Sequence, residues 1–161
     1  MRVLGVDPGT RVTGWGVAER RRGKLVGVAA GVVRPKAKSP LADRLEVIYD
    51  GLEALIEEHR PHALAVEDVF YAKYPNAAIK LGHVRGAVLL LAAKRGLHLA
   101  EYPPALVKRT VAGRGAAEKE QVARVVAAML GFHEKLAVDA TDALAVAITH
   151  LQASAGRQSV P

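Results

Sequence analysis

The chain has no cysteine among its 161 residues. This excludes a disulfide scaffold, a zinc finger and a cysteine nucleophile, and it is compatible with a reducing compartment. No apolar run approaches the roughly 18 residues that span a bilayer, and the longest, residues 87–93, is followed directly by Lys94 and Arg95. The first residues also lack the apolar region of a signal peptide, because Asp7 interrupts them. We therefore expect a soluble cytoplasmic protein.

Repeats, low-complexity tracts and interdomain linkers are also missing from the sequence. The length suits one domain with a real core. We expect a single domain over residues 1–153 and a flexible C-terminal tail over residues 154–161.

Acidic residues are fewer than basic ones. The chain has 23 lysines and arginines against 16 aspartates and glutamates, a net charge of +7, and its pI is near 9.9. Half of the residues are hydrophobic, which is ordinary for a globular protein. A small domain this basic is a candidate for binding a polyanion, although many basic proteins bind no nucleic acid.

The hydrophobic pattern changes from strand-like to helical and back along the chain. Three strands with short connections predict an antiparallel meander, and the later strands alternate with helices. This order predicts an α/β fold with a five-stranded mixed sheet and helices on both faces. The strands are expected at residues 3–7, 13–19, 25–33, 63–67 and 97–102, and the helices at 41–60, 77–95, 105–111, 118–130 and 140–153.

Four acids occupy positions that suit a metal site. Asp7 and Glu67 end two predicted strands, while Asp139 and Asp142 lie three residues apart at the start of the last predicted helix and share one face. Clusters that offer only oxygen ligands hold Mg²⁺ or Mn²⁺. Two such ions about 4 Å apart activate water for phosphodiester hydrolysis.

Each acid also has an ordinary structural explanation. Asp7 precedes Pro8-Gly9 and is a typical turn former, and Glu67 suits a solvated strand end. Asp139 suits an N-cap, and Asp142 suits the first turn of a helix. Their joint occurrence at strand ends favours the metal site, because buried acids without a cation would repel one another.

Several blocks along the chain resemble those of the RuvC-type Holliday-junction resolvases. They are DPGT at 7–10, TGWG at 13–16, EDVF at 67–70, AIKLG at 78–82, the stretch 107–119 and DATDALAVAI at 139–148. The resemblance extends from residue 2 to about residue 152, in the order and spacing of the family.

The resemblance implies a ribonuclease-H-like fold and a homodimer. It also implies a cytoplasmic protein of the bacterial type. It implies an endonuclease, dependent on Mg²⁺ or Mn²⁺ with two ions per site, that nicks two strands of a four-way DNA junction symmetrically during recombination and repair. The catalytic and metal-binding acids would be Asp7, Glu67, Asp139 and Asp142. Branch-migration proteins would be partners. Asp68 departs from the family, which often has an uncharged polar residue there.

The resemblance also suggests residues that contact DNA. Phe70, three residues after Glu67, is expected to stack on an unpaired base, with a core phenylalanine as the alternative. Lys108 and Lys119 match basic positions near the scissile phosphate, with solvated helix lysines as the alternative. Arg114 lies in a narrow turn from which it can reach the DNA backbone.

A basic track on the second predicted helix and the segment before it is a further prediction. Lys73, Lys80 and Arg85 would bind DNA along it. Gly82 and Gly86 on the same helix suggest close helix packing, and this helix is our candidate for the dimer interface.

Three other functions fit parts of the pattern. Actin-like ATPases and sugar kinases share the DPGT opening, but they need two copies of the fold and the chain has no second block of this kind. A ribonuclease that cuts RNA–DNA hybrids would share the fold and the acids without needing Phe70 or a dimer. A junction-binding architectural protein would carry the acids for structural reasons only.

Overall fold

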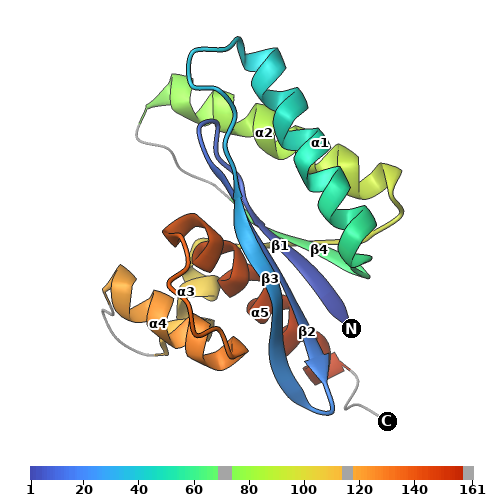
Figure 1. Ribbon diagram of the computed structural model, residues 1–161, viewed down its shortest axis with the longest axis vertical. Coiled ribbons are helices and arrows are strands. Elements are labelled where there is room, and N and C mark those ends of the chain that lie inside the picture. Colours follow the sequence, from blue (N-terminus) through green and yellow to red (C-terminus); the bar gives the residue numbers. More distant parts are fainter. Residues whose placement is uncertain (69–73, 114–117, 158–161) are drawn as a thin grey trace.

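Short runs rich in valine, alanine and glycine form the strands, and runs with apolar residues every three or four positions form the helices. A computed structural model describes residues 1–68, 74–113 and 118–157. The strands are β1 (Arg2–Asp7), β2 (Thr13–Arg21), β3 (Lys24–Val33), β4 (Ala63–Glu67) and β5 (His98–Tyr102) (Figure 1). The helices are α1 (Leu41–His59), α2 (Pro75–Lys94), α3 (Pro104–Ala112), α4 (Lys119–Leu130) and α5 (Val138–Arg157).

The strands form one sheet in the order β3-β2-β1-β4-β5. β1, β2 and β3 pair antiparallel, whereas β4 pairs parallel with both β1 and β5. The predicted five-stranded mixed sheet is therefore confirmed. β1 lies at its centre and pairs antiparallel with β2 on one side and parallel with β4 on the other.

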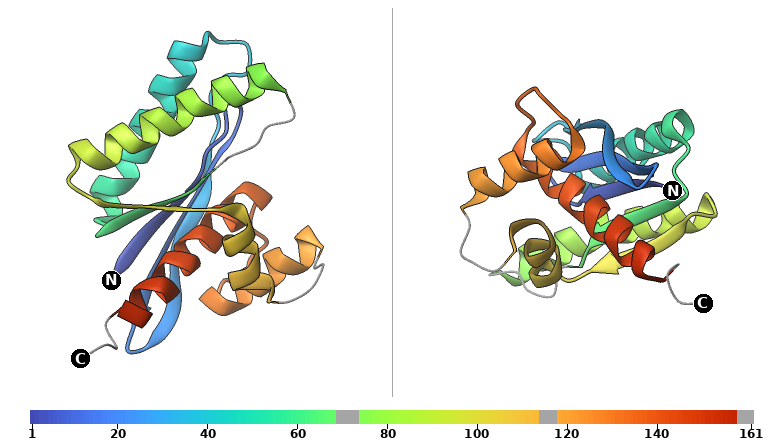
Figure 2. Two further views of the ribbon diagram at one scale, coloured as in Figure 1. Left: turned by 180° about the vertical axis from the view of Figure 1, so that it is seen from behind. Right: turned by 90° about the horizontal axis from the view of Figure 1, so that it is seen from below.

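Helices cover both faces of the sheet, as the sequence predicted. α1 and α2 pack on one face and α3, α4 and α5 on the other, so that the sheet separates two layers of helix (Figure 2). Successive side chains of a strand point to opposite faces. On β1, Leu4 and Val6 accordingly belong to the core under α1 and α2, and Val3 to the core under α5.

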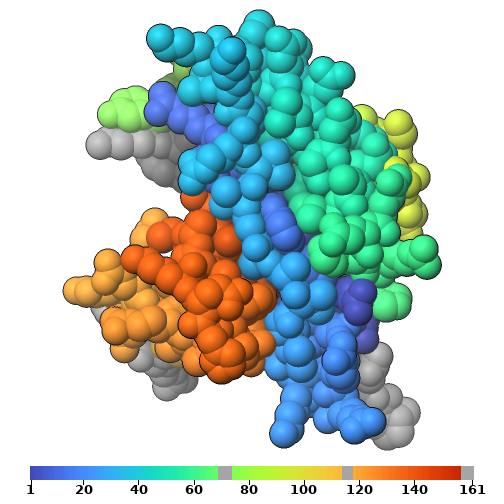
Figure 3. All heavy atoms as spheres, viewed as in Figure 1, coloured from blue at the N-terminus to red at the C-terminus, as the bar shows by residue number. Residues whose placement is uncertain are grey.

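The carboxyl ends of β1 and β4 open into a recess in the outline of the molecule. In the space-filling view it lies on the left, between the light-green start of α2 and the orange α4 (Figure 3). Two pockets lie in this part of the molecule, one lined by Glu67 with residues of α3, α4 and α5, the other by the β1–β2 loop with residues of α1 and α2.

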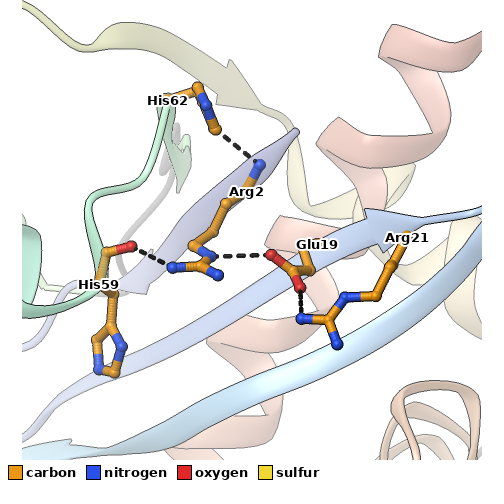
Figure 4. A network of polar contacts seen from close by, with 5 residues as sticks. All are labelled: Arg2, Glu19, Arg21, His59 and His62. Carbon is orange, nitrogen blue, oxygen red and sulfur yellow. Dashed lines mark hydrogen bonds and ion pairs between the residues drawn. The ribbon is translucent and has the colours of Figure 1, made fainter.

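A polar network at the opposite end of β1 fixes the start of the chain (Figure 4). The Arg2 guanidinium donates to the carbonyl oxygen of His59 at 2.6 Å and pairs with Glu19 at 2.9 Å, and the Arg2 backbone N–H donates to His62 Nδ1. Arg21 also pairs with Glu19. Burial raises the pKa of Glu19, but the hydrogen bonds from Arg2 and Arg21 prevail and hold that pKa below its usual value.

Two helices differ from their predicted bounds by more than one residue at an end. α2 begins at Pro75 because a proline is well suited to the first helical position. α5 continues to Arg157, four residues beyond the predicted end of the last helix at residue 153. The Ser154 hydroxyl donates to the carbonyl oxygen of His150 at 2.8 Å, one turn back, so this polar residue does not end the helix. Residues 158–161 lie outside the described part of the chain.

Of the helices in the described ranges, none combines the length and the apolar character that crossing a membrane requires.

Candidate active site

Asp7 and Glu67 end neighbouring parallel strands. Val6 lies beside Val66 in the register of β1 and β4, so the next residues, Asp7 and Glu67, are adjacent at the carboxyl edge of the sheet. The alternation of side chains places both on the face that α5 covers, together with Val3 and Ala65. The prediction that two strand ends bring these acids together is confirmed in the geometry.

Helix α5 brings Asp139 and Asp142 to the same edge. Gly14 lies opposite Asp7 in the β1–β2 pairing, and a Cβ atom at Gly14 would lie 1.9 Å from the carbonyl oxygen of Asp139. A Cβ atom at Gly5 would similarly lie 2.0 Å from the carbonyl oxygen of Ala143. The backbone of α5 therefore lies directly on the backbones of β1 and β2, which only glycine permits.

These glycines were not singled out in the sequence as positioning residues. Gly5, Gly14 and Gly16 alternate on one face of β1 and β2, and Gly16 faces Leu144 of α5 in the same way. Glycines spaced two apart in adjacent strands are a signal that a helix approaches closely on that face.

The turn after β1 is held by a buried threonine. The Thr13 hydroxyl donates to the carbonyl oxygen of Gly9 at 2.8 Å and accepts from the Gly9 N–H at 3.3 Å. Thr13 is fully buried, and a Cβ atom at Gly9 would lie 2.1 Å from the carbonyl oxygen of Val12. The sequence DPGT followed by Thr13 thus makes a tight turn that fixes the end of β1 beside Asp7.

The carboxylates act on one another electrostatically. Burial, then Asp142, Glu67 and Asp139, raise the pKa of Asp7 from 3.8 to about 7, against the opposing effect of Lys119. Burial and Asp142 also raise the pKa of Glu67. Negative charge is therefore crowded here beyond what the protein itself compensates, and a cation would relieve it.

Burial is also the main cause that raises the pKa of Asp142. Lys119 lowers this pKa and Asp139 raises it. Lys119 acts on Asp7 and Glu67 too, so its ammonium group lies near three of the four acids.

No three histidine, aspartate or glutamate side chains in the described ranges are arranged as ligands of one metal ion. The donor set nevertheless fits Mg²⁺ or Mn²⁺, because it consists of carboxylate oxygens at one edge of the sheet. Three of these carboxylates, Asp7, Glu67 and Asp142, have raised pKa values. Binding would require these side chains to turn toward a common centre.

A pocket of about 290 Å³ joins two of the acids to two predicted DNA-binding lysines. Glu67 and Asp142 line it together with Lys108 of α3 and Lys119 of α4. Both lysines are exposed. A recess with carboxylates on one wall and ammonium groups on another suits a metal-bound phosphodiester.

The remaining predicted DNA contacts have different outcomes. Lys80 lines a second pocket, described below. Arg85 is only 16% exposed, with Nη1 3.1 Å from Asp68 Oδ1, and it also pairs with Glu101. The guanidinium of Arg85 is thus already engaged, and Asp68 faces Arg85. Phe70, Lys73 and Arg114 lie outside the described residues.

The order of strands, with carboxylates at the ends of the central pair β1 and β4, defines a ribonuclease-H-like fold with an acidic site. The sequence model of the family described as "Crossover junction endodeoxyribonuclease RuvC" matches residues 3–150. The chain therefore belongs to the RuvC family.

Individual relatives agree with this assignment. The chain is 51% identical over 154 residues to a crossover junction endodeoxyribonuclease RuvC of Sorangium cellulosum, covering 96% of this chain and 86% of the relative. It is similar, with a TM-score of 0.88 and 35% identity, to T. thermophilus RuvC in complex with Holliday junction substrate, over 97% and 96% of the two chains. A yeast mitochondrial Holliday junction resolvase has the same fold, with a TM-score of 0.75 and 15% identity, over 97% and 80%.

Proposed function

We propose that the protein is a structure-selective endodeoxyribonuclease that resolves four-way DNA junctions in recombination and repair. The observation that carries this proposal is the gathering of Asp7, Glu67, Asp139 and Asp142 at one edge of the sheet, in a chain of the RuvC family. The similarity to a relative solved with a Holliday junction supports the substrate class.

The catalytic acids would hold two divalent cations, Mg²⁺ or Mn²⁺. Bound at carboxylates, such ions activate a water and stabilise the leaving oxygen of a phosphodiester. The ligands proposed are Asp7, Glu67, Asp139 and Asp142, of which Asp7 has the greatest need of a positive partner because its pKa is about 7.

The lysines of the 290 Å³ pocket would bind and orient the DNA. Lys119 faces the acids and Lys108 lines the same pocket, so a phosphate held between them lies against Glu67 and Asp142. An ammonium group acts as a mobile point charge that suits a phosphate. Stacking by Phe70 and backbone contacts by Lys73 and Arg114 remain predictions.

A homodimer would place one such site on each of two equivalent strands of a junction. Helix α2 offers the surface for it. Ile79 and Leu90 are 60% and 57% exposed, and Gly82 and Gly86 complete a stripe on one side of the helix with nothing within 4 Å of their Cβ positions. The predicted close packing at these glycines is absent among the described residues, so the stripe is left for a second copy.

The cytoplasm is the compartment we propose for this reaction, with branch-migration proteins as partners. Both proposals rest on the resemblance to the family.

Cleavage of an end-labelled synthetic four-way junction tests the function. With Mg²⁺ or Mn²⁺ we expect paired symmetric nicks on the junction and none on a linear duplex or an RNA–DNA hybrid, and EDTA should abolish them. Cutting of the hybrid would instead indicate a ribonuclease, and binding without cutting under either metal would indicate an architectural protein.

Asp7→Asn separates the acids from the DNA-binding surface. The variant should lose at least about 100-fold in cleavage rate while keeping junction affinity, because it removes a metal ligand and no basic residue. Asp50→Asn, the same change on an exposed position of α1, is the matched control and should cut normally. Normal cleavage by Asp7→Asn would contradict the proposed site.

A further inference from the structure

A second pocket, of about 710 Å³, lies on the opposite side of the end of β1 from the acids. It is formed by the β1–β2 loop, α1 and α2, and its lining includes Gly9, Thr10, Arg11, Arg44, Asn76 and Lys80. The two pockets have no lining residue in common, so this pocket is separate from the one that Glu67 and Asp142 line.

The charge of this pocket is positive and uncompensated. Arg11, Arg44 and Lys80 line it, and no carboxylate of the described residues does. In the described ranges none of these three side chains forms an ion pair. Three cations at one pocket without counter-charges favour an anionic ligand.

Arg44 adds an unused donor to the pocket. Its Nη1 reaches the carbonyl oxygen of Thr10 only at 3.4 Å. Its Nε is buried and has no hydrogen-bond partner among the described residues. A buried donor left unpaired costs about 1–3 kcal/mol, which a ligand that accepts from it would recover.

The start of α2 faces the same space. Asn76 and Ala77 belong to the first turn of this 20-residue helix and line the pocket. The first turn contains no acidic residue, and no side chain caps it. Its free N–H groups and the helix dipole add positive potential to that of the side chains.

The pocket is close enough to the acids to bind the same DNA molecule. Gly9 follows Asp7 by two residues, a span of at most about 7 Å. A strand with one phosphodiester at Asp7 and Glu67 therefore has neighbouring phosphates within reach of Arg11 and Arg44.

We propose that Arg11, Arg44 and Lys80, with the start of α2, bind a non-reacting backbone phosphate of the junction DNA. This inference rests on the proposed function and adds a second phosphate site to it. Lys80 was expected to contact DNA as part of a track along α2, whereas the structure groups it with two arginines of other elements.

Salt dependence of junction binding, measured in EDTA so that no cleavage occurs, tests this site. Lys80→Gln, Arg11→Gln and Arg44→Gln should each weaken binding about threefold or more at low salt. Each should also reduce the slope of log K against log salt concentration, by at most about 0.9, because the three residues share one phosphate. The control is Lys24→Gln, which removes the same charge from an exposed position at the far end of the sheet. It should leave the slope unchanged.

A junction carrying single neutral methylphosphonate linkages locates the contact. One linkage near the crossover should weaken binding of the unaltered protein and should have no further effect on Lys80→Gln or Arg44→Gln. Lys80 is exposed, so its variant remains informative if Arg44→Gln unfolds. If the loss of affinity from the linkage and the loss from the substitution add fully at every linkage position, the proposal is overturned.

The two proposals fail in different ways. An unaltered protein that neither binds nor cuts the junction would overturn the proposed function. Normal cutting, with pocket variants that behave like Lys24→Gln, would overturn only the second phosphate site. Stabilisation of the protein by inorganic phosphate that the pocket variants abolish, without a change in the junction slope, would likewise overturn it in favour of a free-anion site.

Discussion

Asp7 is the side chain on which burial and three other carboxylates act together. Its pKa of about 7 is the result of these effects, and Lys119 opposes them only in part. The position of Asp7 at the end of a buried strand could be predicted from sequence, but the strength of this coupling could not. It depends on how closely α5 lies against β1 and β2.

The raised pKa of Asp7 predicts a loss of stability at higher pH in the absence of metal. An unfolded aspartate loses its proton near pH 3.8, and the folded one near pH 7. Between these values the folded state holds more protons, so its stability falls as pH rises. In EDTA the melting temperature should therefore fall as the pH rises from about 4 to about 7.

Asp7→Asn should remove much of that fall and be more stable than the parent at pH 8, by about 1 kcal/mol or more. Mg²⁺ should raise the melting temperature of the parent at pH 8 more than that of the variant. Asp50→Asn should keep the pH dependence. The same pH dependence in the parent and in Asp7→Asn would refute the assignment.

Arg85 illustrates what the sequence could not specify about single residues. Its place on a helix with Lys80 suggested a shared basic track, yet its partners Asp68 and Glu101 come from beyond β4 and from β5. Such pairing depends on tertiary contacts between segments distant in sequence, whereas the four acids follow from local rules about strand ends and helix starts.

Helix α5 depends on the glycines beneath it. Gly14→Ala would bring a Cβ atom to 1.9 Å from the Asp139 carbonyl oxygen, so α5 must move. A displacement of about 1 Å at a reacting centre costs about 100-fold in rate. We expect that loss in junction cleavage, with the protein still folded.

Gly156→Ala on the same helix is the control, because nothing lies within 4 Å of its Cβ position. It should cut normally and be no less stable than the parent, since alanine favours a helix more than glycine does. Circular dichroism of both variants would exclude unfolding. Full activity of Gly14→Ala would mean that α5 does not set the position of Asp139.

The exposed stripe on helix α2 can be tested as a dimer interface. Ile79→Glu or Leu90→Glu should convert a dimer into a monomer in light scattering, because each places a charge in the stripe proposed for the interface. Val47→Glu is the control, since Val47 is 44% exposed on α1, outside that stripe. A dimer that persists in both α2 variants would place the interface elsewhere.

For the molecule as a whole, the sequence predicts the layers well and the pockets poorly. Hydrophobic period and connection length predict five strands in a mixed sheet and helices on both faces, and the structure has them. The pocket of Arg11, Arg44 and Lys80 draws on three elements. No local pattern relates residues so far apart, because their proximity exists only after the sheet and helices have assembled.

The close packing of α5 on the sheet also determines when, during synthesis of the chain, the site becomes complete. Asp7 belongs to β1 and emerges early, whereas Asp139 and Asp142 belong to α5 and emerge late. A nascent or stalled chain that stops before Val138 therefore carries half of the acids and an uncovered sheet face. Since domains fold as units once their long-range contacts are available, the nuclease would remain inactive during translation and gain its cutting site only when α5 docks.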